Sequence, residues 1–256
     1  MNILVTNDDG IESGSLPVLL KTLKKTGKFN ILTVVPDREQ SGSSHSITLT
    51  RPLRLTKVRK NVYTLDGTPT DCVNVVLLKG LSFKKIDLVI SGINRGPNLS
   101  EDVFYSGTVA AAREAALFNL PAIAVSLVTD KKNPDYSFAA LFITRLLTIK
   151  KWQKKELLNI NIPDIDKRKI KGVHITFLGN RKYKDVLVKR KDPWGNPYFW
   201  LQGKSVVYSR QPDSDCFEVS RGFISITPLS LNLTDKVNFE NMKKLLEEKK
   251  WQKILY

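Results

Sequence analysis

The chain has 256 residues, 41% of them hydrophobic and 26% charged, which suits a folded protein with one main domain. It has no run of about 20 consecutive apolar residues and no basic segment ahead of its first apolar run, so we expect a cytoplasmic protein without a membrane span or secretion signal. The net charge of +16 favours polyanions in general, but the basic residues lie in short scattered runs without interleaved aromatic residues, so a solvated lysine-rich surface explains the charge better than a dedicated nucleic-acid site.

The first part of the chain alternates apolar runs of strand length with amphipathic runs of helix length, which is the pattern of β–α units on a parallel sheet. Pro at a first helical position and Gly beyond a last one indicate helix ends. The elements that we predict are a strand over 2–6, a helix from Ser15 to Gly27, a strand over 29–35, an exposed loop over 37–47, a short strand over 62–65, a helix starting at Pro69, a strand over 86–90, a loop over 91–107, an Ala-rich helix from Thr108, a strand over 121–127 and a helix over 136–147.

The pattern changes after Pro163, where short strands separated by Gly, Pro and Asn turns replace the β–α units. We predict strands over 173–178, 186–189, 198–201 and 223–227, which should form an antiparallel appendage, and a last amphipathic helix over 239–251. His174 lies inside one of these apolar strand patterns and is read as structural. The two cysteines, Cys72 and Cys216, form no metal-binding pattern and are expected to be buried free thiols.

Two adjacent carboxylates, Asp8 and Asp9, follow the first predicted strand directly. This is the carboxyl edge, where open α/β sheets place their ligands. Neighbouring carboxylates raise each other's pKa, so a pair held there implies a cation or a shared proton, and oxygen ligands favour Mg²⁺, Mn²⁺ or Ca²⁺. A simple turn is the alternative, because Asp-Gly after a strand is common turn chemistry.

The loop after the second predicted strand is rich in hydroxyls and flexible backbone amides, from Ser41 through Ser44 to Ser46. Such groups complete the coordination of a metal ion or surround a phosphate, although a serine-rich turn looks the same in sequence. His45 lies in this loop and could bind phosphate or protonate a leaving alkoxide. An incidental polar histidine is the simpler alternative.

A third polar loop, over 91–107, carries Asn94 and Asn98 and ends at Ser106, Gly107 and Thr108, where the Ala-rich helix begins. Free amides at a helix amino terminus bind anions, although Ser106 could equally be an ordinary helix cap. The chain has neither a G-x-x-x-x-G-K-[ST] motif nor a G-x-G-x-x-G motif after its first strand, which argues against nucleoside triphosphatases and dinucleotide-binding proteins. Because loops at one sheet edge meet in space, we expect these three loops to form one site.

An ordered set of motifs spans nearly the whole sequence: Asn7-Asp8-Asp9-Gly10, Pro36-Asp37-Arg38 with Ser41-Gly42, Gly67-Thr68-Pro69-Thr70-Asp71-Cys72-Val73, Ser91-Gly92-Ile93-Asn94, Gly96-Pro97-Asn98, Tyr105-Ser106-Gly107-Thr108, Asn159-Ile160-Asn161-Ile162-Pro163 and Ser225-Ile226-Thr227-Pro228-Leu229. In these motifs the chain resembles the SurE survival-protein nucleotidases. The sequence departs from the family over 11–16, where Glu12-Ser13-Gly14-Ser15 stands in place of an Ala-x-Gly-Ile pattern.

The resemblance implies specific roles. One divalent metal ion per subunit, Mg²⁺ or Mn²⁺, would be held by Asp8, Asp9, Ser41 and Asn94, and phosphate would be held by Ser44, His45, Asn98, Ser106, Gly107 and Thr108. The resemblance also implies hydrolysis of nucleoside 5′- and 3′-monophosphates and of short polyphosphate. It further implies a Rossmann-like catalytic core over 1–163, and a C-terminal part over 164–256 with the β appendage, a return strand and a terminal helix through which subunits form dimers or tetramers.

Two mechanisms remain open from the sequence. Metal-activated water could attack phosphorus, with Asn98 and Ser106 stabilising the phosphate oxygens, or Asp8 or Asp9 could act as nucleophile. A haloacid-dehalogenase-like phosphatase is less consistent, because that chemistry uses Asp-x-Asp and the carboxylates here are adjacent. The rivals from other classes are a basic nucleic-acid-binding protein and a phosphate or nucleotide sensor without turnover.

Overall fold

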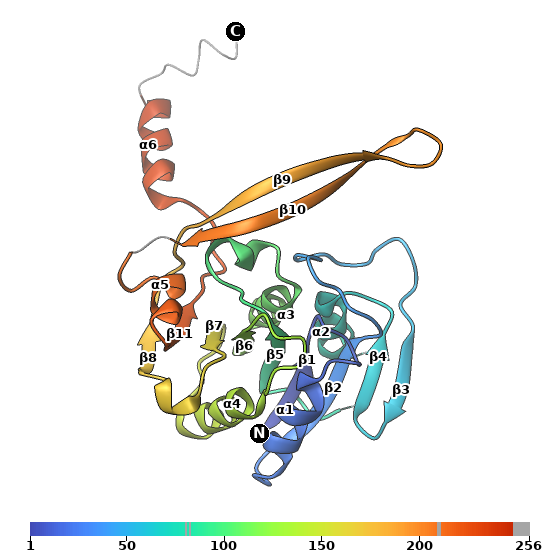
Figure 1. Cartoon of the computed structure of the whole chain (residues 1–256). Coiled ribbons are helices and arrows are strands. Elements are labelled where there is room, and N and C mark those ends of the chain that lie inside the picture. Colours follow the sequence, from blue (N-terminus) through green and yellow to red (C-terminus); the bar gives the residue numbers. More distant parts are fainter. Residues whose placement is uncertain (80, 82, 209–210, 248–256) are drawn as a thin grey trace.

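The protein is described from a computed structural model that covers residues 1–79, 81, 83–208 and 211–247, without the side chains of 181–186, 202–208 and 246–247. Nine strands form one sheet with helices on both faces (Figure 1). From edge to edge, the strands are β3 (Leu55–Arg59), β4 (Val62–Leu65), β2 (Asn30–Pro36), β1 (Asn2–Thr6), β5 (Leu88–Arg95), β6 (Ala122–Val128), β7 (Leu157–Pro163), β11 (Phe223–Pro228) and β8 (Gly172–Ile175).

The central strands run parallel, and the helices between them bury both faces of the sheet. Helices α1 (Ser15–Lys24) and α4 (Ser137–Ile149) cover one face, and α2 (Pro69–Leu77) and α3 (Gly107–Leu117) cover the other. The strands are therefore almost continuously apolar, as expected for a sheet covered on both sides. This α/β architecture confirms the fold class predicted from the sequence.

The carboxyl-terminal part of the chain combines sheet strands with two projecting elements. Strands β9 (Arg181–Lys191) and β10 (Pro197–Tyr208) pair antiparallel in a sheet of their own, as predicted for the appendage, and β11 returns to the main sheet antiparallel to β7. The appendage prediction is wrong for β8 and β11, because both pair within the main sheet, where β8 lies parallel to β11 at the edge, and neither pairs with the hairpin in the described part of the chain. Two 3₁₀ turns, η1 (Ser100–Phe104) and η2 (Lys167–Lys169), and two helices, α5 (Asp215–Ser220) and α6 (Lys236–Glu247), complete the described elements.

Other boundaries also differ from the prediction. Strand β5 continues to Arg95, so Asn94 lies in a strand and not in the predicted loop, because it stays paired with β6 beyond an irregularity near Gly92. Strand β3 was not predicted, and it is an edge strand with mostly exposed residues, which give no apolar pattern. The predicted helix end at Trp251 lies outside the described residues. Cys72 and Cys216 are buried free thiols, as predicted.

One buried carboxylate joins the third loop to the carboxyl-terminal part. Asp215 is 0% exposed, and its two oxygens accept the backbone N–H groups of Ser100 at 2.8 Å, Gly179 at 2.9 Å and Cys216 at 2.7 Å. These contacts connect η1, the root of the β9–β10 hairpin and α5. Because all three donors are buried with the carboxylate, water cannot replace it.

We therefore expect Asp215→Ala to lower the free energy of unfolding by about 3 kcal/mol, since three buried N–H groups lose a charged acceptor. Urea unfolding followed by circular dichroism measures this change. Asp166→Ala is the matched control, because Asp166 is an exposed carboxylate whose partner Arg168 lies in the same turn. An equal small effect in both variants would contradict the anchoring role of Asp215.

Candidate active site at the carboxyl edge of the sheet

The turn after β1 is built to present two carboxylates. The Asn7 side chain donates to the carbonyl of Gly10 and accepts its N–H, both at 3.0 Å, which closes the turn over Asp8 and Asp9. Gly10 has φ +80°, a conformation that favours glycine, and a β-carbon there would lie 2.8 Å from the carbonyl carbon of Arg38. The turn and the loop after β2 thus pack backbone to backbone.

The two carboxylates differ in their surroundings. Asp8 is 4% exposed, and both of its oxygens are engaged by Thr108, through the hydroxyl and through the backbone N–H at 3.2 Å. Burial raises the pKa of Asp8 against the effect of these hydrogen bonds. Asp9 is only partly buried and accepts a long hydrogen bond from Ser13 at 3.4 Å. Burial, together with the charge of Asp8, raises the pKa of Asp9 to about 6, while a backbone hydrogen bond from Arg95 acts in the opposite direction.

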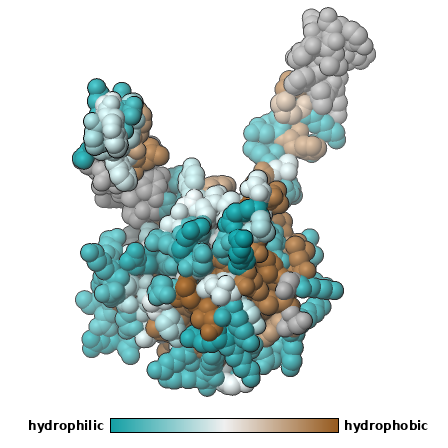
Figure 2. Space-filling view, turned by 90° about the vertical axis from the view of Figure 1, so that its right-hand side faces the viewer, coloured by the Kyte–Doolittle hydropathy of each residue, from teal (hydrophilic) through white to brown (hydrophobic). Residues whose placement is uncertain are grey.

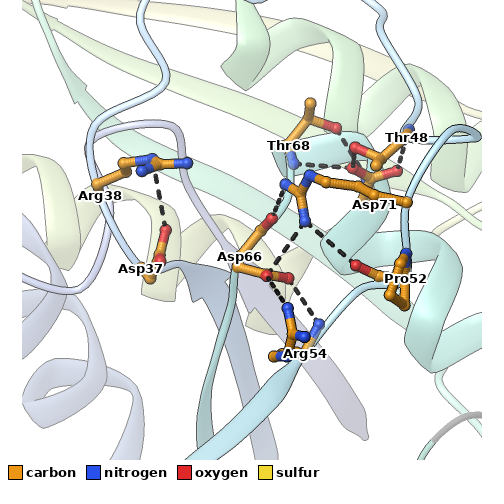
Figure 3. A network of polar contacts seen from close by, with 9 residues as sticks. Asp37, Arg38, Thr48, Pro52, Arg54, Asp66, Thr68 and Asp71 are labelled. Carbon is orange, nitrogen blue, oxygen red and sulfur yellow. Dashed lines mark hydrogen bonds and ion pairs between the residues drawn. The ribbon is translucent and has the colours of Figure 1, made fainter.

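The loop after β2 is attached to this turn at its start and to α2 at its end. The Gln40 N–H donates to the Asp8 carbonyl at 2.7 Å, which attaches the residue before Ser41 to the carboxylate turn. At the other end, Thr48 donates twice to Asp71, at 2.7 and 2.9 Å, and Asp71 forms a capping box with Thr68 at the start of α2 (Figure 3). The Ser-rich segment between these attachments is therefore fixed at both ends.

Several hydroxyls of this loop and its histidine ring already have hydrogen-bonding partners in the protein. Ser41 donates to Glu39 at 2.7 Å, and Ser44 donates to the Phe104 carbonyl at 2.7 Å. His45 Nε2 lies 2.6 Å from the Glu114 carboxylate, on α3. These contacts, together with the Ser44 N–H that donates to the Tyr105 carbonyl at 3.0 Å, connect the second loop to the third loop and to α3.

Asn98 is the most firmly held of the predicted residues. Its carbonyl accepts from Asn159 at 2.8 Å and from Asn161 at 2.9 Å, its N–H donates to Asn161 at 2.9 Å, and its side chain donates to Ser126 at 2.8 Å. Asn159, Asn161 and Ser126 are fully buried, and they are not among the residues predicted for the site. Asn residues alternating with apolar ones in the buried strand β7 were the signal that could have identified them.

Asn94 and Ser106 use their side-chain oxygens differently. Asn94 donates its amide N–H to the Gly96 carbonyl at 3.0 Å, which leaves its amide oxygen as a potential ligand. Ser106 accepts the Val109 N–H at 3.1 Å and thus caps α3. A β-carbon on Gly107 would lie 3.0 Å from the Asp8 β-carbon, so the start of α3 and the carboxylate turn are in close contact. Thr108 directs its N–H and hydroxyl to Asp8.

A cavity of about 650 Å³ opens beside Asp9 and is lined by Arg38, Glu39, Arg95 and Tyr136, among others. Burial, together with the charge of Asp9, raises the pKa of Tyr136 to about 12, so its hydroxyl remains a donor at neutral pH. The two arginines were not among the residues chosen from the sequence. A larger cavity of about 930 Å³, beside Lys24, Lys60 and Lys84, contains none of the predicted site residues.

A second group of potential metal ligands lies elsewhere. His174, Asp213 and Glu218 each place one ligand atom within 4.8 Å of the others, so this group could hold a metal ion. His174 was predicted to be structural, and it does contact Glu218, with Nδ1 3.3 Å from Oε2.

Among the described helices, none is both long enough and apolar enough to cross a membrane.

Comparisons with known proteins agree on one family. The family described as survival protein SurE matches residues 3–185. The protein named 5′-nucleotidase SurE of Geotalea uraniireducens is 44% identical over 95% of this chain and 98% of its own length, and its counterpart in Carboxydothermus hydrogenoformans is 44% identical over 100% and 97%. The crystal structure of the SurE protein from Aquifex aeolicus matches with a TM-score of 0.81 at 37% identity, over 96% of this chain and 99% of that one.

Proposed function

Because this chain belongs to the SurE family, we propose that it is a divalent-metal-dependent phosphomonoesterase that hydrolyses nucleoside 5′- and 3′-monophosphates, and also short polyphosphate. The observation that carries the proposal is the pair Asp8–Asp9 at the carboxyl end of β1, in contact with the amino terminus of α3. The names of the relatives support a nucleotidase. A cytoplasmic location stays part of the proposal.

The residues of this site suit a hard divalent cation. Two adjacent carboxylates with raised pKa values are destabilised as anions, and a cation relieves that cost. Asp8, Asp9, the Ser41 hydroxyl and the Asn94 amide oxygen would hold Mg²⁺ or Mn²⁺, both of which prefer oxygen ligands. When bound, such an ion lowers the pKa of a coordinated water and offsets charge on the phosphate.

The residues of the chain would then orient the phosphate. Thr108 fixes the direction of Asp8, while the Gly107 N–H at the start of α3, Ser106 and Asn98 would donate to phosphate oxygens. Ser44, His45 and Thr108 complete the proposed phosphate-binding set, and the Glu114 contact holds the His45 ring in place. Hydrolysis adds water across the bond from phosphorus to the ester oxygen, so the released alcohol takes up a proton.

The role of the carboxylates has a direct test. An in-line attack by water inverts the configuration at an isotopically chiral phosphate, whereas two displacements through an aspartyl-phosphate retain it. Retention would assign Asp8 or Asp9 as the nucleophile, and inversion would leave both as ligands.

The proposed activity is tested by phosphate release from a panel of nucleoside 5′- and 3′-monophosphates and tripolyphosphate, each with Mg²⁺, with Mn²⁺ and without metal. We expect turnover of the monophosphates only with metal. Nucleotide binding without phosphate release would favour a sensor. Binding of DNA or RNA with a steep salt dependence and no phosphate release would favour the nucleic-acid-binding alternative raised by the +16 charge.

Metal removal should act reversibly. We expect dialysis against EDTA to reduce AMP hydrolysis to background, because the carboxylates alone do not activate water at neutral pH, and added Mn²⁺ or Mg²⁺ to restore it. Far-ultraviolet circular dichroism recorded in parallel separates loss of the ion from loss of the fold. Full activity in EDTA would contradict the metal-dependent proposal.

We further propose that the projecting elements form a dimer or tetramer. Figure 2 shows the β9–β10 hairpin and α6 as two arms standing clear of the body, and both carry exposed apolar residues. These are Leu187, Trp194, Phe199, Trp200, Leu201, Val237, Phe239, Met242 and Leu245. An exposed apolar set of this size favours burial against another subunit. Light scattering during size-exclusion chromatography tests this, and a monomer at micromolar concentration would contradict it.

A further inference from the structure

The second ligand group lies far from the carboxylate turn in the fold. His174 belongs to β8, Glu218 to α5 and Asp213 to the segment just before α5. Five strand spacings separate β1 from β8 in the sheet order, which corresponds to about 24 Å. An ion bound to this group would therefore be distinct from one bound to Asp8 and Asp9.

The three ligand residues are fixed by the backbone. The Phe177 N–H donates to the Asp213 carbonyl at 3.1 Å, and the Asp215 N–H donates to the Phe177 carbonyl at 2.9 Å, so the Asp213 segment is hydrogen-bonded to the chain that follows β8. The His174 ring packs on Phe223 with ring centres 4.3 Å apart, and Glu218 lies within α5. Sites supported by such contacts bind with little reorganisation.

Glu218 is a buried carboxylate that is poorly satisfied by its protein partners. Its side chain is 1% exposed, yet its contacts with the Asp213 N–H, with Arg221 and with His174 are 3.3 to 3.4 Å long. Hydrogen bonds to charged groups are ordinarily about 2.7–2.9 Å long. Asp213 adds a second negative charge beside it, while the Arg221 side chain is 48% exposed. The site thus has capacity for a further cation.

We propose that His174, Asp213 and Glu218 bind a transition-metal ion of the Zn²⁺ class, in addition to the hard cation proposed at Asp8 and Asp9. An imidazole nitrogen with two carboxylates is a ligand set for Zn²⁺, Co²⁺ or Ni²⁺, whereas Mg²⁺ prefers oxygen ligands alone. The bound ion would link β8 to α5 at the root of the β9–β10 hairpin (Figure 1). Its effect would be on stability and not on the chemistry of phosphate release.

The test uses the full chain with Asp8→Asn and Asp9→Asn, which removes the carboxylates of the other proposed site. Co²⁺ is added in the presence of excess Mg²⁺, and visible absorption is recorded together with the binding stoichiometry. We expect one equivalent of Co²⁺ with ligand-field bands, and a rise in melting temperature of several degrees with Zn²⁺. The Co²⁺ bands and the Zn²⁺-induced rise in melting temperature should both disappear when His174→Gln or Asp213→Asn is added to this variant.

Two controls make the assignment specific. His45→Gln removes the other histidine of the chain, and Asp166→Asn removes an exposed carboxylate elsewhere, so both should keep the Co²⁺ bands and the Zn²⁺ stabilisation. Asp213 is exposed, so its substitution tests the site even if a change at His174 harms folding. Unchanged Co²⁺ binding in the Asp213→Asn variant, or no binding in the parent, would overturn the proposal. Neither outcome depends on whether the protein hydrolyses nucleotides.

Discussion

Asp9→Asn is expected to reduce AMP hydrolysis by about 1,000-fold or more, while making the metal-free protein more stable at neutral pH. The loss of activity follows because the substitution removes one of the two carboxylates proposed to hold the catalytic ion, and an amide is a weaker ligand for a hard cation. The gain in stability follows because burial and the charge of Asp8 raise the pKa of the Asp9 carboxylate to about 6. The ionised carboxylate therefore destabilises the folded protein at neutral pH, and asparagine removes that charge.

The sign of the pH effect follows from the raised pKa of Asp9. Between the ordinary value of 3.8 and about 6, the folded protein holds a proton that the unfolded chain has released. Raising the pH through this window therefore lowers the free energy of unfolding, and the full cost persists above pH 6. The asparagine variant lacks this cost, so we expect it to be about 1–2 kcal/mol more stable than the parent at pH 7 in EDTA, allowing for partial exposure of the group, and equally stable near pH 4.

Two measurements check this expectation. Steady-state phosphate release at saturating Mn²⁺ gives the activity, and urea unfolding in EDTA at pH 4 and pH 7 gives the stability. Asp166→Asn serves as the control, because it removes an exposed carboxylate remote from the site and should leave activity unchanged. Near-normal turnover by the Asp9→Asn variant would remove the basis for the metal site at Asp8 and Asp9.

The parts of the fold that could be predicted from sequence are those with a regular apolar pattern. Buried strands such as β1 and β6, and the capped helix α2, match their predicted positions within one or two residues, because burial on both sides and the Thr68–Asp71 capping box leave local signals. The exposed edge strand β3 and the parallel pairing of β8 have no such signal. Pairing of β8 depends on contacts with β11, about 50 residues later in the chain.

The meeting of the three loops could be predicted from sequence, but the contacts between them could not. The sequence placed Asp8, Ser41 and Asn98 in loops at one edge, and the loops do meet there. It could not indicate that Thr108 would direct both donors to Asp8, or that buried amides of β7 would hold Asn98, since these contacts join residues about 60 to 100 positions apart. The assignment of each residue to metal or phosphate stays a prediction.

Substituting Gly107 by Ala should be the most damaging change at the start of α3, although alanine is the better helix former. A β-carbon there would lie 2.7 Å from the Ser43 hydroxyl, 3.0 Å from the Asp8 β-carbon and 3.1 Å from the Pro69 side chain. The Ser43 hydroxyl can rotate away, but Asp8 is held by its turn and Pro69 by α2. The helix start must therefore move away from the carboxylates by a few tenths of an ångström or more.

A displacement of that kind separates the Gly107 and Thr108 N–H groups from the groups they orient, so we expect kcat/KM for AMP to fall by about 100-fold. Gly14→Ala is the matched control: Gly14 precedes α1 as Gly107 begins α3, but a β-carbon at Gly14 meets nothing closer than 3.9 Å. That variant should keep its activity. If Gly107→Ala retains both activity and metal affinity, the start of α3 is not part of the catalytic site, and the phosphate would have to be held by the arginines of the adjacent cavity, Arg38 and Arg95.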